Sequence, residues 1–111
     1  MASVEQCEHA LHELADRMAA SDSARSKAGF DRSISCTIRD LGVVFTGRLK
    51  DGQLIGIGQA ANGEAQVRLT MTSDDLLALV DGRLKMAPAW ASGKVKVEAG
   101  VRDLLRLRSI F

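Results

Sequence analysis

The chain has 111 residues, of which 15 are basic and 14 acidic, and 46% are apolar. This length and apolar content predict one compact domain and exclude an intrinsically disordered chain. The near balance of charge, without a basic run, argues against a nucleic-acid partner and against a polybasic membrane patch.

The N-terminal residues match no targeting pattern. Residues 1–10 lack a basic start followed by an apolar run, as a signal peptide would have. No run of about 18 apolar residues occurs, so we expect no stable membrane insertion. These features predict a cytoplasmic protein. The two cysteines, Cys7 and Cys36, have neither a disulfide nor a zinc spacing and are expected to be buried thiols.

Residues 3–20 predict an amphipathic helix. Ser3 followed by Gln6 is a capping-box signature for its start. Apolar residues then recur at intervals of three and four, which places them on one stripe; they are Val4, Cys7, Leu11, Leu14 and Met18. Residues 21–32 follow as a polar connector.

Residues 33–71 predict four consecutive strands, because the apolar period changes from 3.6 to two. The pairs Asp51-Gly52 and Asn62-Gly63 favour tight hairpin turns between strands. We therefore expect an antiparallel meander with one buried face. The expected strands comprise 34–38, 43–49, 54–59 and 67–71.

Two glycines, Gly56 and Gly58, interrupt the third expected strand. Glycine weakens a strand interior, so this pair indicates a bulge or the close approach of another element. The pair is not a dinucleotide-binding fingerprint, because it lies inside a hairpin strand and not in a turn between strand and helix.

A second helix is expected to begin at Thr72-Ser73-Asp74-Asp75, where hydroxyls can cap it and acidic groups suit its dipole. Gly82 is expected to end it in a left-handed conformation. Pro88 favours the start of a helical turn that carries Trp90 and closes at Gly93.

The C-terminal part predicts a fifth strand at 94–98 and an amphipathic helix at 101–110. The order of elements predicts an α+β domain, with a five-stranded, mostly antiparallel sheet and helices covering one face. The whole chain, 1–111, is expected to form this one domain. Residues 1–32 supply the first helix and connector, and 33–111 supply the sheet and the other helices.

No catalytic, metal or cofactor site is predicted. His9 and His12 are the only histidines, and with Glu13 they could clasp a metal. They lie off the apolar stripe, however, and do not form the zinc-protease pattern, so an incidental solvent-facing pair is the preferred interpretation. No serine occupies a nucleophile elbow with a histidine to activate it.

Residues 71–97 resemble the sterol carrier protein 2 family. Met-Thr-Ser-Asp-Asp-Leu-Leu-Ala-Leu-Val-Asp-Gly-Arg-Leu (71–84) is similar to that family's helix and closing glycine. Ala-Trp-Ala-Ser-Gly-Lys-Val-Lys-Val (89–97) is similar to its Ala-Phe pair and its Gly-Lys-Leu-Lys-Ile strand. With the preceding strands, the resemblance covers about four-fifths of the chain.

The resemblance implies a non-catalytic carrier with an apolar tunnel between sheet and helices, binding a fatty acid, fatty acyl-CoA, sterol-like molecule or phospholipid. The matching cavity residues are Phe45, Leu69, Met71, Leu76, Leu79, Val80, Leu84, Met86, Trp90, Leu104 and Leu105. The alternative is an interaction module, in which the same groove pairs with a second copy or a partner protein without a lipid.

Overall fold

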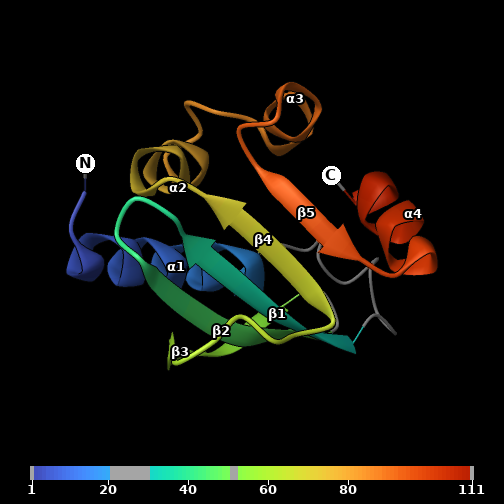
Figure 1. Ribbon diagram of the computed structural model, residues 1–111, viewed down its shortest axis with the longest axis horizontal. Coiled ribbons are helices and arrows are strands. Elements are labelled where there is room, and N and C mark those ends of the chain that lie inside the picture. The colour runs from blue at the N-terminus through green and yellow to red at the C-terminus, as the bar shows by residue number, and fades with distance from the viewer. Residues whose placement is uncertain (1, 21–30, 51–52, 111) are drawn as a thin grey trace.

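The computed structural model describes residues 2–20, 31–50 and 53–110. Its helices are α1 (Val4–Ala20), α2 (Ser73–Val80), α3 (Met86–Ser92) and α4 (Val101–Ile110). Its strands are β1 (Asp31–Ile38), β2 (Val43–Lys50), β3 (Gln53–Ala60), β4 (Val67–Met71) and β5 (Lys96–Ala99) (Figure 1). Most of the predicted connector, 21–30, and the predicted Asp51-Gly52 turn lie outside the described residues.

The five strands form one sheet in the order β3-β2-β1-β4-β5. β1 and β4 are parallel, whereas the other neighbouring pairs are antiparallel. The α+β class and the mostly antiparallel sheet are therefore confirmed. The predicted meander is wrong at its fourth strand, because β4 pairs with β1 and leaves β3 at the sheet edge.

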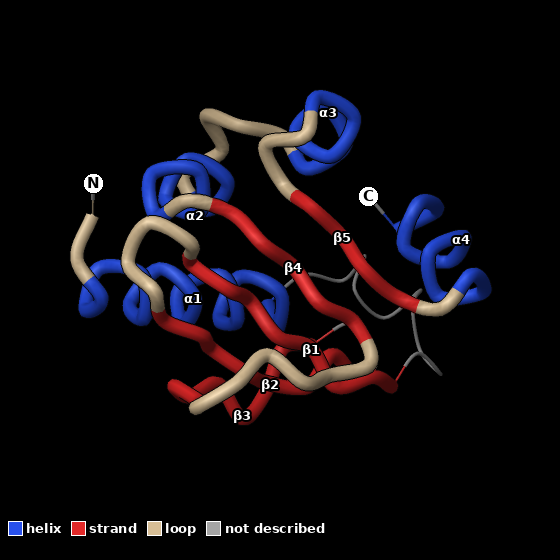
Figure 2. The backbone as a smooth tube through the Cα atoms, viewed as in Figure 1, coloured by secondary structure: helices blue, strands red, loops and turns tan. Residues whose placement is uncertain are grey.

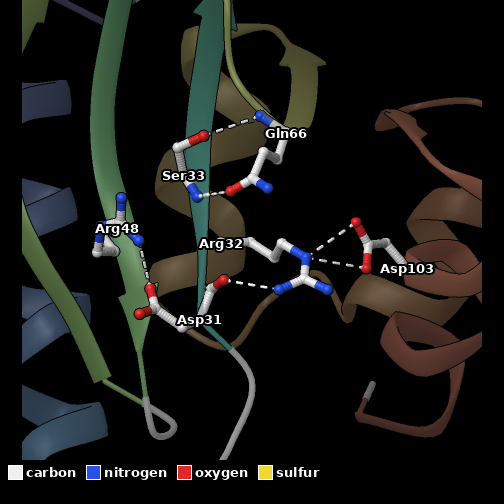
Figure 3. Close-up of polar contacts among 6 residues, drawn as sticks. All are labelled: Asp31, Arg32, Ser33, Arg48, Gln66 and Asp103. Atoms are coloured by element: carbon white, nitrogen blue, oxygen red, sulfur yellow. Dashed lines mark hydrogen bonds and ion pairs between the residues drawn. The ribbon is translucent and has the colours of Figure 1, made fainter.

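The segment 61–66 explains this error. β3 and β4 run in the same direction, so they need a crossover and not a hairpin turn. Figure 2 shows this segment crossing in front of β1 and β2. Ser35 Oγ donates a hydrogen bond to the Gly63 carbonyl at 2.9 Å. Ser33 and Gln66 exchange two bonds, of 3.0 and 2.9 Å, which fasten the end of the crossover to β1 (Figure 3).

The opposite face of the sheet carries the core. Alternate residues of β1 and β4 point to this face, and the register pairs Cys36 with Leu69 and Ile38 with Met71. α1 lies behind the sheet in Figure 1, and its Cys7 is completely buried. The predicted capping box is confirmed: Ser3 N–H donates to Gln6 Oε1 at 2.8 Å and Gln6 N–H to Ser3 Oγ at 3.1 Å.

The predicted bulge in the third strand is also confirmed. The β2–β3 register shifts between Thr46 and Arg48, and Gly56 has a φ of +65°. Residues with a side chain rarely adopt that backbone conformation, whereas glycine does so freely. Gly47 lies opposite the bulge, where a Cβ atom would come within 3.0 Å of the Ile55 carbonyl oxygen.

The predicted caps of the second helix form as expected. Thr72 is the N-cap and accepts from Asp75 N–H, and Gly82 has a φ of +80°. α3 begins two residues before Pro88, which fits its first turn because the N–H there needs no helical partner. Gly93 ends α3 with a φ of +84°.

Two polar clusters fasten the helices to the sheet. Ser73, which is completely buried, accepts from Ala2 N–H at 2.9 Å and donates to Asp40 Oδ2 at 2.6 Å. At the far end of β1, Arg32 Nε contacts both carboxylate oxygens of Asp103 on α4, at 3.1 and 3.2 Å (Figure 3). The first cluster joins the N-terminal segment to α2, and the second joins α4 to the sheet.

Candidate functional site

A cavity of about 560 Å³ lies between the inner face of the sheet and the helices. Its wall on the sheet consists mainly of apolar side chains from four strands: Ile34, Cys36, Phe45, Leu49, Leu54, Ile57, Leu69 and Met71, with Ser35, Thr46 and Gly47. Its wall on the helices comes from α1, α2 and the segment that leads into α3: Leu11, Leu14, Leu76, Leu79, Val80, Gly82, Leu84, Lys85 and Met86.

The sequence builds the sheet wall through strand alternation and one interruption of it. Phe45 and Met71, on β2 and β4, are almost completely buried and line the cavity. On β3 the lining residues are Leu54 and Ile57, three residues apart. Strict alternation would place such a pair on opposite faces. The bulge at Gly56 re-aims the strand, so that both side chains line the cavity.

Eight of the eleven predicted site residues line this cavity. They are Phe45, Leu69, Met71, Leu76, Leu79, Val80, Leu84 and Met86. Their proximity follows from the strand register and from α2, which begins directly after β4 in the chain. Whether they contact a bound lipid stays a prediction.

The other three predicted residues lie elsewhere. Trp90 packs in a small cluster around the buried Val67, because α3 covers the β4–β5 side of the sheet. Leu104 and Leu105 belong to α4, which packs beside β5, and 62% of Leu105 is exposed. None of the three is among the described residues that line the cavity.

Several lining residues were not among the predicted ones. Leu11 and Leu14 belong to the apolar stripe of α1, and Ile34 and Cys36 to the alternating face of β1. Both patterns were visible in the sequence, but they indicated only a buried face. Apart from Phe45, the cavity residues that the resemblance implies lie between residues 69 and 105, so it does not indicate the contribution of α1 and β1.

The chemistry of the cavity wall is close to that of a hydrocarbon. Burial, and to a smaller extent the electrostatic effect of Cys7, raises the pKa of the Cys36 thiol to about 12. Cys36 is therefore uncharged at neutral pH. Lys85 is the only charged residue among the described ones that line the cavity.

The histidines of α1 lie outside this cavity. His12 Nε2 is 4.0 Å from Glu8 Oε1, and both side chains are about half exposed. Among the described residues, no three histidine, cysteine, aspartate or glutamate side chains gather closely enough to hold a metal ion. Within the same part of the chain, no helix combines the length and the apolar character needed to cross a membrane.

Solved structures with the same fold include two proteins from the mosquito Aedes aegypti. Sterol carrier protein 2-like 2 is 16% identical, with a TM-score of 0.67 over 96% of this chain and 97% of that one. Sterol carrier protein 2 in complex with palmitate is 20% identical, with a TM-score of 0.63 over 99% and 96%. These structural similarities establish the fold, which agrees with the resemblance seen in residues 71–97.

A third solved structure is the stereoselective inverting sec-alkylsulfatase Pisa1 from Pseudomonas sp., 21% identical with a TM-score of 0.60. The match covers 84% of this chain but only 15% of the sulfatase. A comparison with curated proteins finds no match. The family model for the alkyl sulfatase C-terminal domain matches residues 7–111. The chain therefore belongs to the alkyl sulfatase C-terminal family and has the fold of sterol carrier protein 2.

Proposed function

We propose that this chain binds the hydrocarbon part of a lipid in the cavity and carries it without catalysing a reaction. The observation that supports this function is an apolar space of about 560 Å³ beneath α1 and α2. Small-molecule pockets typically have volumes of about 300–1,000 Å³. Fatty acids, fatty acyl-CoA, sterol-like molecules and phospholipids all contain a part that suits such a wall.

The solved structures support the same proposal. The sterol carrier protein 2 from Aedes aegypti was determined with palmitate, and a palmitated sterol carrier protein 2-like protein from that organism also shares the fold. The second is 17% identical to this chain, with a TM-score of 0.65. A saturated chain of this kind needs few polar contacts, which fits a cavity whose described lining residues include a single charged one.

The proposal makes affinity depend on chain length. Each methylene group that enters an apolar cavity contributes about 0.8 kcal/mol, or about a fourfold gain in affinity. The affinity of a series of saturated fatty acids should therefore rise steeply with length and level off once the cavity is filled. Isothermal titration calorimetry of such a series measures this dependence directly.

Two neighbouring residues on β3 provide a matched test. Leu54 lines the cavity, whereas Ile55 lies outside it with 43% of its surface exposed. Leu54→Trp should occupy part of the cavity and weaken the binding of dodecanoate about fifteenfold, as the loss of space for roughly two methylene groups implies. Ile55→Trp adds the same aromatic group on the other face and should leave binding unchanged.

The outcome of this comparison decides the proposal. Native mass spectrometry of the purified protein should also show co-purifying lipid. Equal affinity of both tryptophan variants for dodecanoate would show that the lipid binds outside the cavity. A wild-type protein that takes up no fatty acid and carries no lipid would end the carrier proposal.

A second candidate function is a module that binds a protein through the same groove. It is favoured by the match to sec-alkylsulfatase, in which this fold corresponds to only 15% of the chain. Light scattering of the purified protein tests pairing with a second copy, and a dimer disrupted by Leu54→Trp would support it. The cytoplasmic location and the one-domain boundary remain predictions.

A further inference from the structure

Among the described residues that line the cavity, one carries a charge. Lys85 lines the cavity beside Gly82 and Leu84, in the connector between α2 and α3. It is also exposed to solvent. A lysine in such a place lays its methylene stem along the apolar wall and keeps its ammonium group in water. The charge therefore lies at the rim, where the cavity meets solvent.

Two other basic residues, next to the lining residues Val80 and Leu84, have acidic partners. Arg17 donates to the Val80 carbonyl oxygen, and its guanidinium is 2.7 Å from Glu13 Oε1. Arg83 lies 3.1 Å from the carboxylate of Asp81. Within the described part of the chain, Lys85 forms no ion pair with a carboxylate. In the part of the chain that the structure describes, Lys85 thus places a positive charge without a carboxylate partner next to an apolar interior.

We propose that Lys85 selects lipids whose head group is a single oxyanion, either a carboxylate or a sulfate ester, over lipids with a neutral head. The inference rests on the proposed function, since it requires a hydrocarbon chain inside the cavity. A ligand bound in this way leaves its head group at the rim. The ammonium group acts there as a point charge, so it attracts either oxyanion without a strict geometry.

The expected preference is modest because the contact is exposed. An ion pair of this kind corresponds to a factor of about two to five in affinity. Salt should reduce the preference, since the Debye length falls to about 3 Å at about 1 M. Lys85 is also the N-cap of α3 but forms no side-chain capping bond. Its replacement therefore removes the charge without removing a cap.

The test compares three ligands with one chain length: dodecanoate, dodecyl sulfate and dodecan-1-ol. Each displaces the neutral fluorophore N-phenyl-1-naphthylamine, below micelle-forming concentrations and at about pH 8, where the carboxylate is ionised. The wild-type protein should bind both anions about two- to fivefold more tightly than the alcohol. Lys85→Gln should bind all three equally, and Lys85→Glu should prefer the alcohol.

Arg83→Gln is the matched control. It removes a positive charge two residues away, from a side chain that is paired with Asp81 and does not line the cavity. This variant should keep the wild-type preference for anions. A preference lost equally in Arg83→Gln and Lys85→Gln would mean that general surface charge attracts the ligands, which overturns the role of Lys85.

The remaining outcomes separate this inference from the function on which it rests. Equal wild-type affinity for the anions and the alcohol, or a preference that survives in Lys85→Gln, overturns the inference while lipid binding stands. Failure of the fluorophore and all three ligands to bind refutes the proposed function itself. If the preference is present, the anion that binds better identifies the head group.

Discussion

The buried hydroxyl of Ser73 should contribute far more to stability than an ordinary surface serine. Ser73→Ala removes the oxygen that accepts from the buried Ala2 N–H group at 2.9 Å, and with it the hydroxyl that donates to Asp40. A buried donor left without a partner costs about 1–3 kcal/mol. Asp40 adds little, because it is exposed and can exchange its lost bond for water. We therefore expect a loss of about 1–3 kcal/mol of unfolding free energy.

Urea denaturation followed by circular dichroism measures this loss. Ser92→Ala, at the exposed last position of α3, is the control and should change stability by less than about 0.5 kcal/mol. Asp40→Asn should cost less than Ser73→Ala, because the Ala2 bond survives. A Ser73→Ala protein as stable as wild type, or less affected than Asp40→Asn, would refute this account of the cluster.

The same cluster gives a dependence on pH. The hydrogen bonds from the Ser73 hydroxyl and N–H hold the pKa of Asp40 below its ordinary value of 3.8. A carboxyl whose pKa is lowered by folding stabilises the folded state above its unfolded pKa and loses that contribution as pH falls through its folded pKa. The stability difference between wild type and Asp40→Asn should therefore be constant near neutral pH and shrink below about pH 4.

Three further predictions concern the sheet and the cavity. Gly47→Ala places a Cβ atom 3.0 Å from the Ile55 carbonyl oxygen and should lower the free energy of unfolding by about 1–3 kcal/mol, as measured by urea denaturation. Gly58→Ala is the control, because its Cβ atom meets no atom within 4 Å. An equal loss of stability in Gly58→Ala would contradict the role of the bulge. Trp90→Ala should lower the free energy of unfolding by about 2–3 kcal/mol, which is less than the loss for a fully buried aromatic residue. Its affinity for dodecanoate should stay within twofold of the wild-type value. Weakened binding would show that Trp90 does line the cavity. The pKa of Cys36 is about 12, against an ordinary 9.0. The fraction of Cys36 present as thiolate should therefore be about a thousandfold lower than in the unfolded chain. Alkylation followed by peptide mass spectrometry measures this reactivity, and rapid alkylation of the native protein would show that Cys36 is not buried.

Local features were predictable because they depend on neighbouring residues. The capping box at Ser3 and Gln6 formed as expected, and so did the left-handed end at Gly82 and the end of the following helix at Gly93. Each is determined by a side chain or a backbone conformation within four residues. The alternation on β1 and β4 likewise identified the buried face before any pairing was known.

Pairing between distant segments was not predictable in the same way. Asn62-Gly63 has the composition of a tight turn, yet the Asn62 side chain accepts from Glu64 N–H at 3.0 Å, within a longer crossover. The choice between pairing with β3 and pairing with β1 depends on tertiary contacts, including the bond from Ser35 to Gly63. The position of Trp90 depends in the same way on how α3 packs against Val67, which no local pattern specifies.

The parallel pairing of β1 with β4 has a consequence for synthesis on the ribosome. β1 is the first strand to emerge and can pair with β2, which in turn pairs with β3. The second partner of β1 is β4, which ends only at Met71 and is followed by α2. Until those residues emerge, Ile34 and Ile38 lack Val67 and Met71, their partners across this edge of β1. The nascent chain therefore passes through a stage with an open central strand edge, the feature that promotes association between chains. Crowding of ribosomes on one message, or a slow stretch of translation before residue 71, would prolong the stage at which newly made chains are prone to aggregate.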